Sequence, residues 1–348
     1  MNRCPRAKAR ADTGRCKQSG ALRRSVGNQR REACIAPGGL DLRRVPELPP
    51  RVARRIAELL LLVEEGPIDA DLLRIPVGPG SIHVERYGHG GAPVVLLHGF
   101  GTSSFLWRNI APEIALANRT AFAMDLFGYG ESDRPFDADF GIASQAELVD
   151  RALTALRLPK ATVVGMDLGG AVALRLAATR PERVERLFLV NPVALDEIPS
   201  GDITALQRNT ARFAFRVSKG ILGAAPILGE LLRRSVADAE HMPDKLVARY
   251  LAPYVGEEGL NHLLLLARSI EDEDMEDVDL RSIPQPVQIV WGDQDPWVTP
   301  KFADRLSDTI PGCRLVHLPG IGRMVPEEAP DTLVSLLLEF IGAAALHS

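Results

Sequence analysis

Short apolar runs alternate with amphipathic segments along most of the chain from residue 72 onward. Runs rich in Val, Ile and Leu, bounded by Gly, Pro, Asn or Asp, predict strands buried in a parallel sheet. These strands are expected at 72–77, 82–87, 94–97, 120–124, 161–164, 186–190, 287–291 and 314–318. Apolar residues at helical spacing predict crossover helices at 105–117, 144–156, 168–179, 301–307 and 330–341. Strands that alternate with helical crossovers predict an α/β fold, with a mostly parallel central sheet and helices on both faces.

The alternation of strands and helices stops at Asn191-Pro192 and resumes near residue 284. Between 193 and 283 the sequence is helical and irregular. Near its end is an acidic run at 271–279, which we interpret as a solvated hinge. An insertion after the sixth strand predicts a helical lid, or cap, over the carboxyl ends of the strands, where ligands of open α/β sheets bind. The core is therefore expected to comprise 71–192 and 284–345.

Two segments precede this core. Residues 1–48 are basic and lack hydrophobic periodicity, so we predict a disordered tail. A targeting peptide and a polyanion-binding arm are the alternatives for this tail. Residues 49–70 are predicted to form an amphipathic helix and a linker, with the apolar face of the helix packed against the body.

Composition and charge narrow the class of protein. The chain is 46% hydrophobic and 25% charged, and it has no apolar run long enough to cross a bilayer, so we expect a protein without a transmembrane segment. Residues 1–45 carry 12 Lys and Arg against three acids; because the whole chain has a net charge of −4, the remainder is at −13. Nucleic-acid binding by the folded core is therefore not expected. The four cysteines lack zinc-like spacing, and their distribution favours a protein of the reducing cytoplasm over one held by disulfides. Nothing in the pattern indicates an oligomeric state, a metal or a cofactor.

The sharpest chemical signal is the turn Gly165-Met166-Asp167-Leu168-Gly169. An apolar strand breaks at Gly165 and a helix follows, so Asp167 is expected on a tight strand-to-helix elbow. Such an elbow holds its central residue at strained backbone angles, and small neighbours let strand and helix approach each other. The pattern predicts a carboxylate nucleophile at Asp167.

Three further motifs follow predicted strand ends. These are His-Gly-Phe-Gly at 98–101, Asp-Leu-Phe-Gly-Tyr-Gly-Glu-Ser-Asp at 125–133 and Trp-Gly-Asp-Gln-Asp-Pro at 291–296. Together with the elbow, and in this order, they resemble the α/β-hydrolase family over roughly residues 70–345. An elbow Asp resembles the epoxide hydrolase and haloalkane dehalogenase branches, and the segment 102–110 is similar to dehalogenases. The resemblance implies an α/β-hydrolase fold, no cofactor and a small apolar substrate.

The resemblance also implies a reaction. Asp167 would attack a saturated carbon, displacing a halide or opening an epoxide, and water would then hydrolyse the alkyl ester at its carbonyl carbon. Backbone N–H groups near Phe100 and Leu168 would stabilise the oxyanion of that second step. His98 lies in the turn beside this oxyanion site.

Other side chains are implied by the same resemblance. Asp295 would orient a histidine base, and Asp293 could take this role instead. Alternatively, both are only turn residues. The lid tyrosines Tyr250 and Tyr254 would either protonate the oxygen of an opening epoxide or simply pack the lid. Their spacing of four predicts one helical face, although Pro253 interrupts it.

The position of the base departs from the family pattern. The family has Pro-Gly-x-Gly-His before Pro-Glu-Glu-Ala-Pro, whereas this chain has Pro-Gly-Ile-Gly-Arg at 319–323. A guanidinium stays protonated at physiological pH, so Arg323 cannot take a proton from water. Instead, it could neutralise Asp167 or Asp295. His317 lies near this position in the sequence, but it is expected to be a strand residue rather than a substitute base.

Three functions remain open on this basis. The first is a hydrolase of an epoxide or haloalkane that acts through an ester on Asp167, with the second step in doubt. The second is a binder of small ligands, or an accessory protein, that has lost hydrolysis. The third is a cofactor-free lyase or isomerase in which Asp167 is a base and Arg323 binds an anionic substrate.

Overall fold

The computed structural model describes residues 70–208 and 224–342. The predicted basic tail, the predicted amphipathic helix and most of its linker lie outside these residues. Eight strands form one sheet in the order β1-β2-β4-β3-β5-β6-β7-β8. The strands are β1 (Asp71–Pro76), β2 (Ser81–Tyr87), β3 (Pro93–Leu97), β4 (Thr120–Met124), β5 (Ala161–Met166), β6 (Val184–Val190), β7 (Val287–Gly292) and β8 (Arg314–Leu318). Only β2 pairs antiparallel, with β1 and with β4, so the sheet is mostly parallel as predicted.

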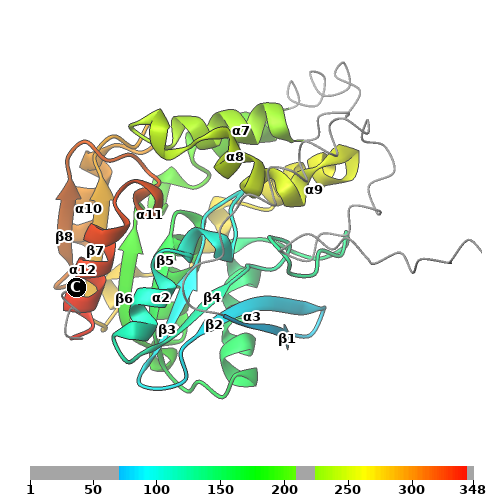
Figure 1. The fold of residues 1–348 in the computed structure, drawn as a ribbon. Helices are drawn as coiled ribbons and strands as arrows, with labels where there is room; N and C mark the ends of the chain where they lie inside the picture. The colour runs from blue at the N-terminus through cyan, green and yellow to red at the C-terminus, as the bar shows by residue number, and fades with distance from the viewer. Residues whose placement is uncertain (1–69, 209–223, 343–348) are drawn as a thin grey trace, which may run out of the picture. The chain divides into compact units, whose positions relative to one another are not determined.

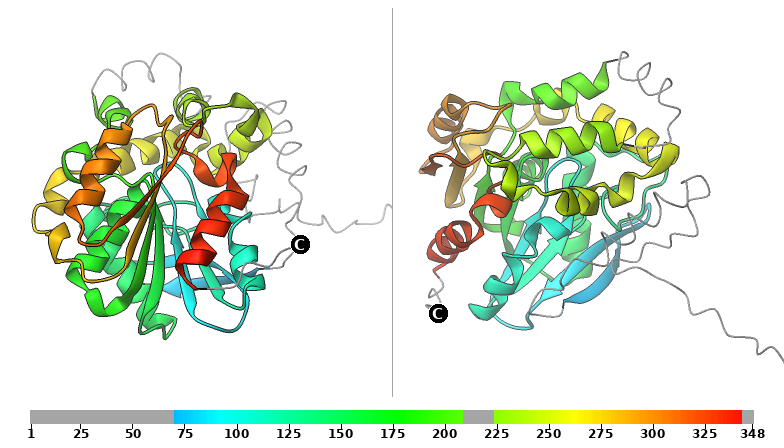
Figure 2. Two further views of the ribbon diagram at one scale, coloured as in Figure 1. Left: turned by 90° about the vertical axis from the view of Figure 1, so that its left-hand side faces the viewer. Right: turned by 45° about the horizontal axis from the view of Figure 1, so that its top comes forward.

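Helices cover both faces of this sheet (Figure 2). Those of the core are α2 (Ala111–Leu116), α3 (Ile142–Ala155), α4 (Leu168–Thr179), α10 (Pro300–Thr309), α11 (Val325–Glu328) and α12 (Pro330–Phe340). In Figure 2, α2 and α12 lie on one face and α3, α4 and α10 on the other. The fold class predicted from the hydrophobic pattern is confirmed.

One predicted helix, 105–117, is wrong. The structure has a short 3₁₀ helix, η2 (Ser104–Trp107), and then α2, with turn residues between them. Pro112 lies in the first turn of α2. Proline lacks the backbone N–H that a continuous helix would need there, and its ring would clash with the carbonyl group four residues earlier, at Arg108.

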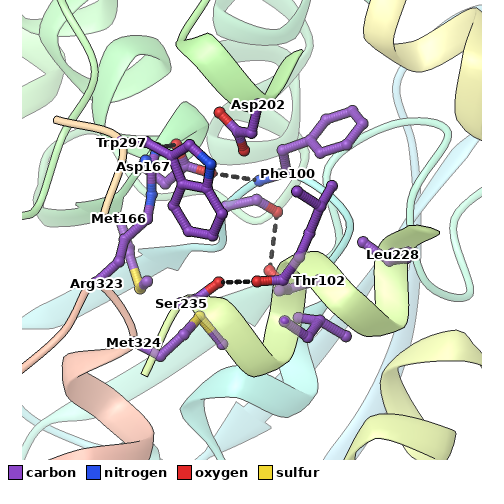
Figure 3. A pocket seen from close by; sticks show the side chains of 13 residues that line it. Phe100, Thr102, Met166, Asp167, Asp202, Leu228, Ser235, Trp297, Arg323 and Met324 are labelled. Carbon is purple, nitrogen blue, oxygen red and sulfur yellow. Dashed lines mark hydrogen bonds and ion pairs between the residues drawn. The ribbon is translucent and has the colours of Figure 1, made fainter. Parts of the chain in front are cut away.

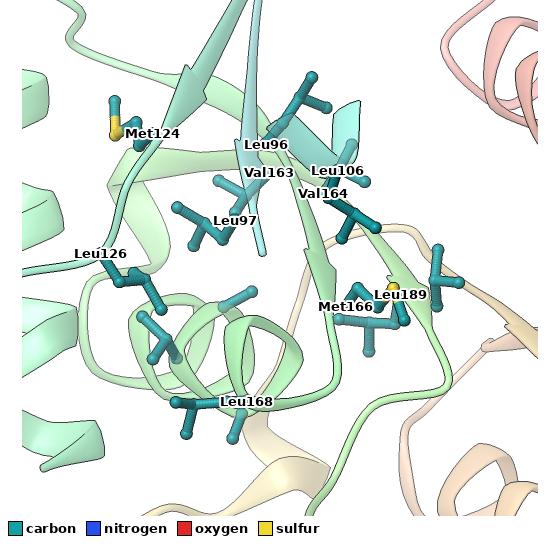
Figure 4. Close-up of a cluster of buried hydrophobic side chains, with 14 of the residues drawn as sticks. Leu96, Leu97, Leu106, Met124, Leu126, Val163, Val164, Met166, Leu168 and Leu189 are labelled. Carbon is teal, nitrogen blue, oxygen red and sulfur yellow. The ribbon is translucent and has the colours of Figure 1, made fainter. Parts of the chain in front are cut away.

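The parallel strands form the centre of the core. Every residue of β4, β5 and β7 is buried, whereas in the edge strand β1 exposed positions alternate with partly buried or buried ones. Leu96 and Leu97 of β3 and Val163 and Val164 of β5 are buried in one hydrophobic cluster (Figure 4). Each such side chain stabilises the fold by about 1.5 to 3 kcal/mol. This packing fixes the strand that carries Asp167.

The segment between β6 and β7 is mostly helical. Its elements are η4 (Leu195–Glu197), α5 (Gly201–Gln207), α7 (Ala225–Arg234), η5 (Ala239–His241), α8 (Asp244–Leu251), η6 (Ala252–Tyr254), α9 (Gly256–Arg268), η7 (Asp272–Met275) and η8 (Leu280–Ser282). Helices α7, α8 and α9 lie beyond the carboxyl ends of the parallel strands (Figure 1). Part of the acidic run is tied to the core, because Arg175 of α4 donates to Asp277 at 3.1 Å. Within the described residues, no helix has the length and apolar character needed to span a bilayer.

Candidate active site

Asp167 lies at the elbow between β5 and α4 with φ 53° and ψ −119°. Residues other than glycine rarely adopt a positive φ, so the surrounding structure must hold the Asp167 backbone in this conformation. A Cβ on Gly165 would lie 2.3 Å from the carbonyl oxygen of Gly169, and one on Gly99 would lie 2.7 Å from Asp167 Oδ2. Glycine is therefore required where strand, helix and the neighbouring loop meet around the carboxylate.

The two oxygens of Asp167 have different partners (Figure 3). Oδ2 accepts a hydrogen bond from the backbone N–H of Phe100 at 2.9 Å, and Oδ1 forms an ion pair with Nη2 of Arg323. The side chain of Asp167 is 13% exposed. The structure thus brings together the predicted nucleophile, one predicted oxyanion donor and Arg323.

Arg323 lies in the loop between β8 and α11, between two carboxylates. Its Nη1 is 3.6 Å from Asp295 Oδ1, and its guanidinium stands over the Trp297 ring at 5.7 Å. The loop is held from two sides: Glu328 accepts from the N–H of Gly322 at 2.9 Å, and the N–H of Met324 donates to the Ser235 carbonyl at 3.2 Å. Arg323 is therefore buried and fixed rather than free in a loop.

Asp295 is held by neutral donors. Its Oδ1 accepts from the N–H groups of Trp297 and Val298 at 2.9 and 3.1 Å, and its Oδ2 accepts from Asn191 Nδ2 at 3.1 Å. Asn191 also accepts from the N–H of Gly292 at 2.8 Å, which ties the ends of β6 and β7 together. The sequence interpretation treated Asn191 only as the end of the strand pattern; a polar residue directly after a buried strand was the available signal.

Burial and charge act in opposite directions on Asp167 and Arg323. Burial raises the pKa of the Asp167 carboxyl, while the Arg323 charge and the Phe100 N–H act to lower it. Burial also acts to lower the pKa of Arg323, but Asp167, Asp295 and Asp202 together hold that pKa above its ordinary value. The guanidinium consequently remains charged and cannot serve as a base.

His98 does not face the cavity beside Asp167. It is fully buried; its Nε2 accepts from the N–H of Leu126 at 3.0 Å, so Nδ1 carries the proton and donates to the Gly99 carbonyl at 2.8 Å. Burial lowers the pKa of His98. The ring connects the ends of β3 and β4. Leu168, the other residue predicted at the oxyanion site, begins α4 with its side chain packed in the core (Figure 4).

The two predicted lid tyrosines lie apart from Asp167. Tyr250 of α8 donates its hydroxyl to Glu327, which also forms a bidentate ion pair with Arg108 at 2.7 and 2.6 Å. Tyr254 of η6 is 1% exposed, and its hydroxyl has no hydrogen-bond partner among the described residues. Neither tyrosine lines the cavity at Asp167.

His317 is a residue of β8, as predicted, and does not line the cavity. Its Nδ1 is 2.6 Å from Asp293 Oδ1, and its Nε2 is 3.3 Å from Asp304 Oδ1. Hydrogen bonds to Asp293 and Asp304 raise the pKa of His317. Asp293, the alternative to Asp295, therefore belongs to a separate cluster.

A cavity of about 30 Å³ lies against Asp167 (Figure 3). This volume is enough for about one or two water molecules. Leu228, Leu231 and Leu232 of α7 close one side, while Thr102 and Asp202 add polar groups. No sequence motif pointed to Asp202 or to these leucines. Within the described ranges, no group of three His, Cys, Asp or Glu side chains is arranged to hold a metal ion.

Comparison with known proteins identifies the family. Residues 92–330 match the model of the alpha/beta hydrolase fold. The chain is 28% identical over 279 residues to haloalkane dehalogenase 2 of Mycobacterium tuberculosis (strain H37Rv), covering 76% of this chain and 92% of that one. It is 31% identical over 265 residues to the dihydrolipoyllysine-residue acetyltransferase component of the acetoin cleaving system of Pseudomonas putida, covering 74% of this chain and 65% of that protein's length.

Solved structures show the same fold. An alpha/beta hydrolase fold protein from Burkholderia ambifaria is 28% identical with a TM-score of 0.68, covering 78% of this chain and 99% of that one. The epoxide hydrolase CorEH is 23% identical with a TM-score of 0.68, covering 79% and 99%. The matched family model, the mostly parallel sheet and the strand-end elbow agree. The chain belongs to the alpha/beta hydrolase fold family.

Proposed function

We propose that this protein is a hydrolase in which Asp167 is alkylated by a small apolar haloalkane or epoxide, and that the resulting ester is hydrolysed slowly because Arg323 occupies the position of the base. The observation that carries the proposal is the carboxylate of Asp167, held at a strained elbow against the Phe100 N–H. The 28% identity to a haloalkane dehalogenase supports the same reaction class.

The first step needs only a carboxylate and an electrophilic carbon. An oxygen of Asp167 forms the C–O bond while the carbon–halogen bond breaks and the halide leaves with the electron pair. An epoxide would additionally need an acid to protonate its ring oxygen. Tyr250 is committed to Glu327, and Tyr254 does not line the cavity. A haloalkane therefore suits this site better than an epoxide.

The second step needs a base. Water must attack the carbonyl carbon of the ester, and the Phe100 N–H is positioned to donate to the oxyanion that forms. The raised pKa of Arg323 keeps the guanidinium protonated, so it can stabilise negative charge but cannot accept the water proton. The ester is therefore expected to accumulate.

The size of the cavity sets a condition on substrate entry. A volume of about 30 Å³ holds water but no organic molecule of the expected size. The leucines of α7 that close the cavity must move aside for a substrate. Shortening one of them, as in Leu228→Ala, should therefore speed alkylation.

A second candidate is a small-ligand binder without chemistry. It is favoured by the ion pair between Arg323 and Asp167, which neutralises the carboxylate. The lyase or isomerase alternative loses support, because Arg323 lies between Asp167 and Asp295 and is not free to bind an anionic substrate.

The test is intact mass spectrometry after incubation with matched primary alkyl bromides, chlorides and epoxides. The proposal predicts one alkyl adduct per chain, located by peptide mapping on Asp167, with release of one halide. Asp167→Asn is the matched control and should give neither. Saturable binding of the same compounds without a mass change would support the binder instead.

A further inference from the structure

A second acidic side chain reaches the cavity that holds Asp167. We propose that Asp202 is the general base that activates water for hydrolysis of the Asp167 ester. This inference rests on the proposed function, since it concerns the second step of that reaction.

The position of Asp202 supports this role. It is in the first turn of α5, and it lines the same cavity as Asp167 and Thr102. Figure 3 shows its carboxylate on the side of the cavity where Asp167 and the Phe100 N–H meet. Its charge raises the pKa of both Asp167 and Arg323, as expected for a neighbouring carboxylate.

The carboxylate of Asp202 is available to a water molecule. Its Oδ1 accepts one hydrogen bond, from the Ser200 hydroxyl at 2.5 Å, and none of the ion pairs found in the described residues involves it. An ionised carboxylate can accept about four hydrogen bonds, so capacity remains for water. The side chain is only partly buried, which leaves a path for the proton to solvent.

The cavity can hold the water. Its volume of about 30 Å³ exceeds the 10 to 15 Å³ or so that one water requires. A buried water also needs two or more polar partners. Asp167, Asp202 and Thr102 line this space; the Thr102 hydroxyl donates to the Gly99 carbonyl at 2.8 Å, so its oxygen can still accept a hydrogen bond. In the unmodified protein a water in this space lies beside Asp167; in the ester, the α7 leucines that move aside for the alkyl group must leave room for this water as well.

The other buried acids and bases near the site are already engaged. Both oxygens of Glu328 accept backbone N–H groups, from Gly322 at 2.9 Å and Ala237 at 2.8 Å. Asp295 accepts three hydrogen bonds, and both ring nitrogens of His98 bind backbone groups. Asp202 is the acid in the cavity that combines a free oxygen with proximity to the nucleophile.

Hydrolysis of the ester transfers one proton to Asp202 and then back to the leaving oxygen. The water oxygen bonds to Cγ of the Asp167 ester, and one water proton passes to a carboxylate oxygen of Asp202. The tetrahedral oxyanion collapses, the bond from Cγ to the alkoxy oxygen breaks, and the alkoxide takes the proton from Asp202. The products are an alcohol, ionised Asp202 and Asp167 as a carboxylic acid that carries one oxygen and the second proton of the water; loss of that proton to solvent restores the Asp167 carboxylate.

The experiment follows the lifetime of the Asp167 adduct by intact mass after excess alkyl bromide is removed. Asp202→Asn should extend this lifetime by about 10²- to 10⁴-fold, the range typical of a lost general base. Because alkylation needs no base, the variant should still form the adduct on Asp167, and this adduct formation shows that the variant is folded. Asp308→Asn, an exposed acid on α10, is the matched control and should leave the lifetime unchanged.

A second arm uses Arg323→His, which supplies the base that the family normally has. In that background Asp202→Asn should change the adduct lifetime by less than about twofold, because the histidine takes over. An equal adduct lifetime in the wild type and Asp202→Asn, with normal alkylation, would overturn the role of Asp202 and leave the proposed function standing. Absence of any adduct on the wild-type chain would overturn both.

Discussion

Two loops meet at the site: the elbow that carries Asp167 (the nucleophile side) and the loop that carries Arg323 (the base side). Both are tightly packed, but they present side chains of opposite charge. On the nucleophile side, Gly165 lets β5 and α4 approach so closely that a Cβ on it would lie 2.3 Å from the carbonyl oxygen of Gly169. On the base side the contact is equally close, because a Cβ on Gly292 would lie 1.9 Å from the Gly322 carbonyl oxygen. Both loops therefore hold their side chains firmly, yet one presents a carboxylate and the other a guanidinium that cannot accept a proton. If the proposed function holds, the packing of the site is kept while the side chain at position 323 slows the second step.

The two carboxylates of the site show the same contrast. Asp295 accepts three hydrogen bonds from neutral donors and would remain satisfied without Arg323. Asp167 has one backbone donor, and its other oxygen depends on Arg323. Arg323 is therefore expected to be structural for the nucleophile side as well as inhibitory for hydrolysis.

The largest effect is expected from Arg323→Gln. Removing the guanidinium leaves two buried carboxylates without a cation, which should lower the free energy of unfolding by about 3 to 5 kcal/mol at pH 8. Burial already raises the pKa of Asp167. The folded state of the variant should therefore bind protons that the unfolded state does not, and stability should fall as pH rises above the ordinary carboxyl pKa.

Urea unfolding at pH 5 and pH 8 measures this difference. The destabilisation should be smaller at pH 5. Arg314→Gln, which breaks an exposed pair with Glu339 at 3.4 Å, is the control and should cost less than about 1 kcal/mol. Equal losses for the two variants would show that Arg323 does not support the nucleophile side.

Gly165→Ala tests the close approach on the nucleophile side. The added Cβ meets backbone that cannot move without separating β5 from α4, so we expect a loss of about 3 kcal/mol and slower alkylation. Gly201→Ala, where a Cβ would meet nothing within 4 Å, should leave stability and alkylation nearly unchanged. Thermal unfolding and the rate of adduct formation measure both variants; a silent Gly165→Ala would refute the packing described for the elbow.

Glu328→Gln tests the base side alone. An amide can accept only one of the two backbone hydrogen bonds, from Gly322 and Ala237, that the carboxylate accepts. The free energy of unfolding should fall by about 2 kcal/mol, the scale of one unsatisfied buried donor. Alkylation of Asp167 should be nearly unchanged in stopped-time mass spectra. Loss of alkylation equal to that of Asp167→Asn would mean that the two sides are not separable.

The smallest effect concerns two histidines with opposite shifts. His317 has a raised pKa because of Asp293 and Asp304, so its contribution is present below the ordinary histidine pKa and is lost as pH rises through the raised value. His317→Gln should therefore reduce stability at pH 5.5 by less than about 1 kcal/mol and have no effect at pH 9. His98 has a lowered pKa, so the wild type should lose stability as pH falls below about 6.5, and this loss should persist in His317→Gln. Urea titrations across pH 5.5 to 9 distinguish the two signs.

The hydrophobic pattern was sufficient for the sheet and its order of elements because buried parallel strands are continuous apolar runs. The strand-end motifs also predicted that Asp167, Asp295 and Arg323 converge, since parallel strands end at one edge of a sheet. These signals are local in sequence. Their spatial meaning follows directly from topology.

The remaining parts of the site depend on packing between distant segments. The spacing of four between Tyr250 and Tyr254 predicts one helical face, but the Tyr250 hydroxyl donates to Glu327, 77 residues away in the sequence. Asp202 and Leu228 reach the cavity through the arrangement of α5 and α7, which no periodicity specifies. Only the folded structure could place these side chains.

The most direct test compares the lifetime of the Asp167 adduct in the wild type and in Arg323→His after reaction with the same alkyl bromide. We expect an adduct that persists in the wild type and turns over at least about 100-fold faster in Arg323→His, because a base is restored to an intact loop. Equal lifetimes, with both proteins alkylated on Asp167, would contradict the claim that the residue at position 323 limits hydrolysis.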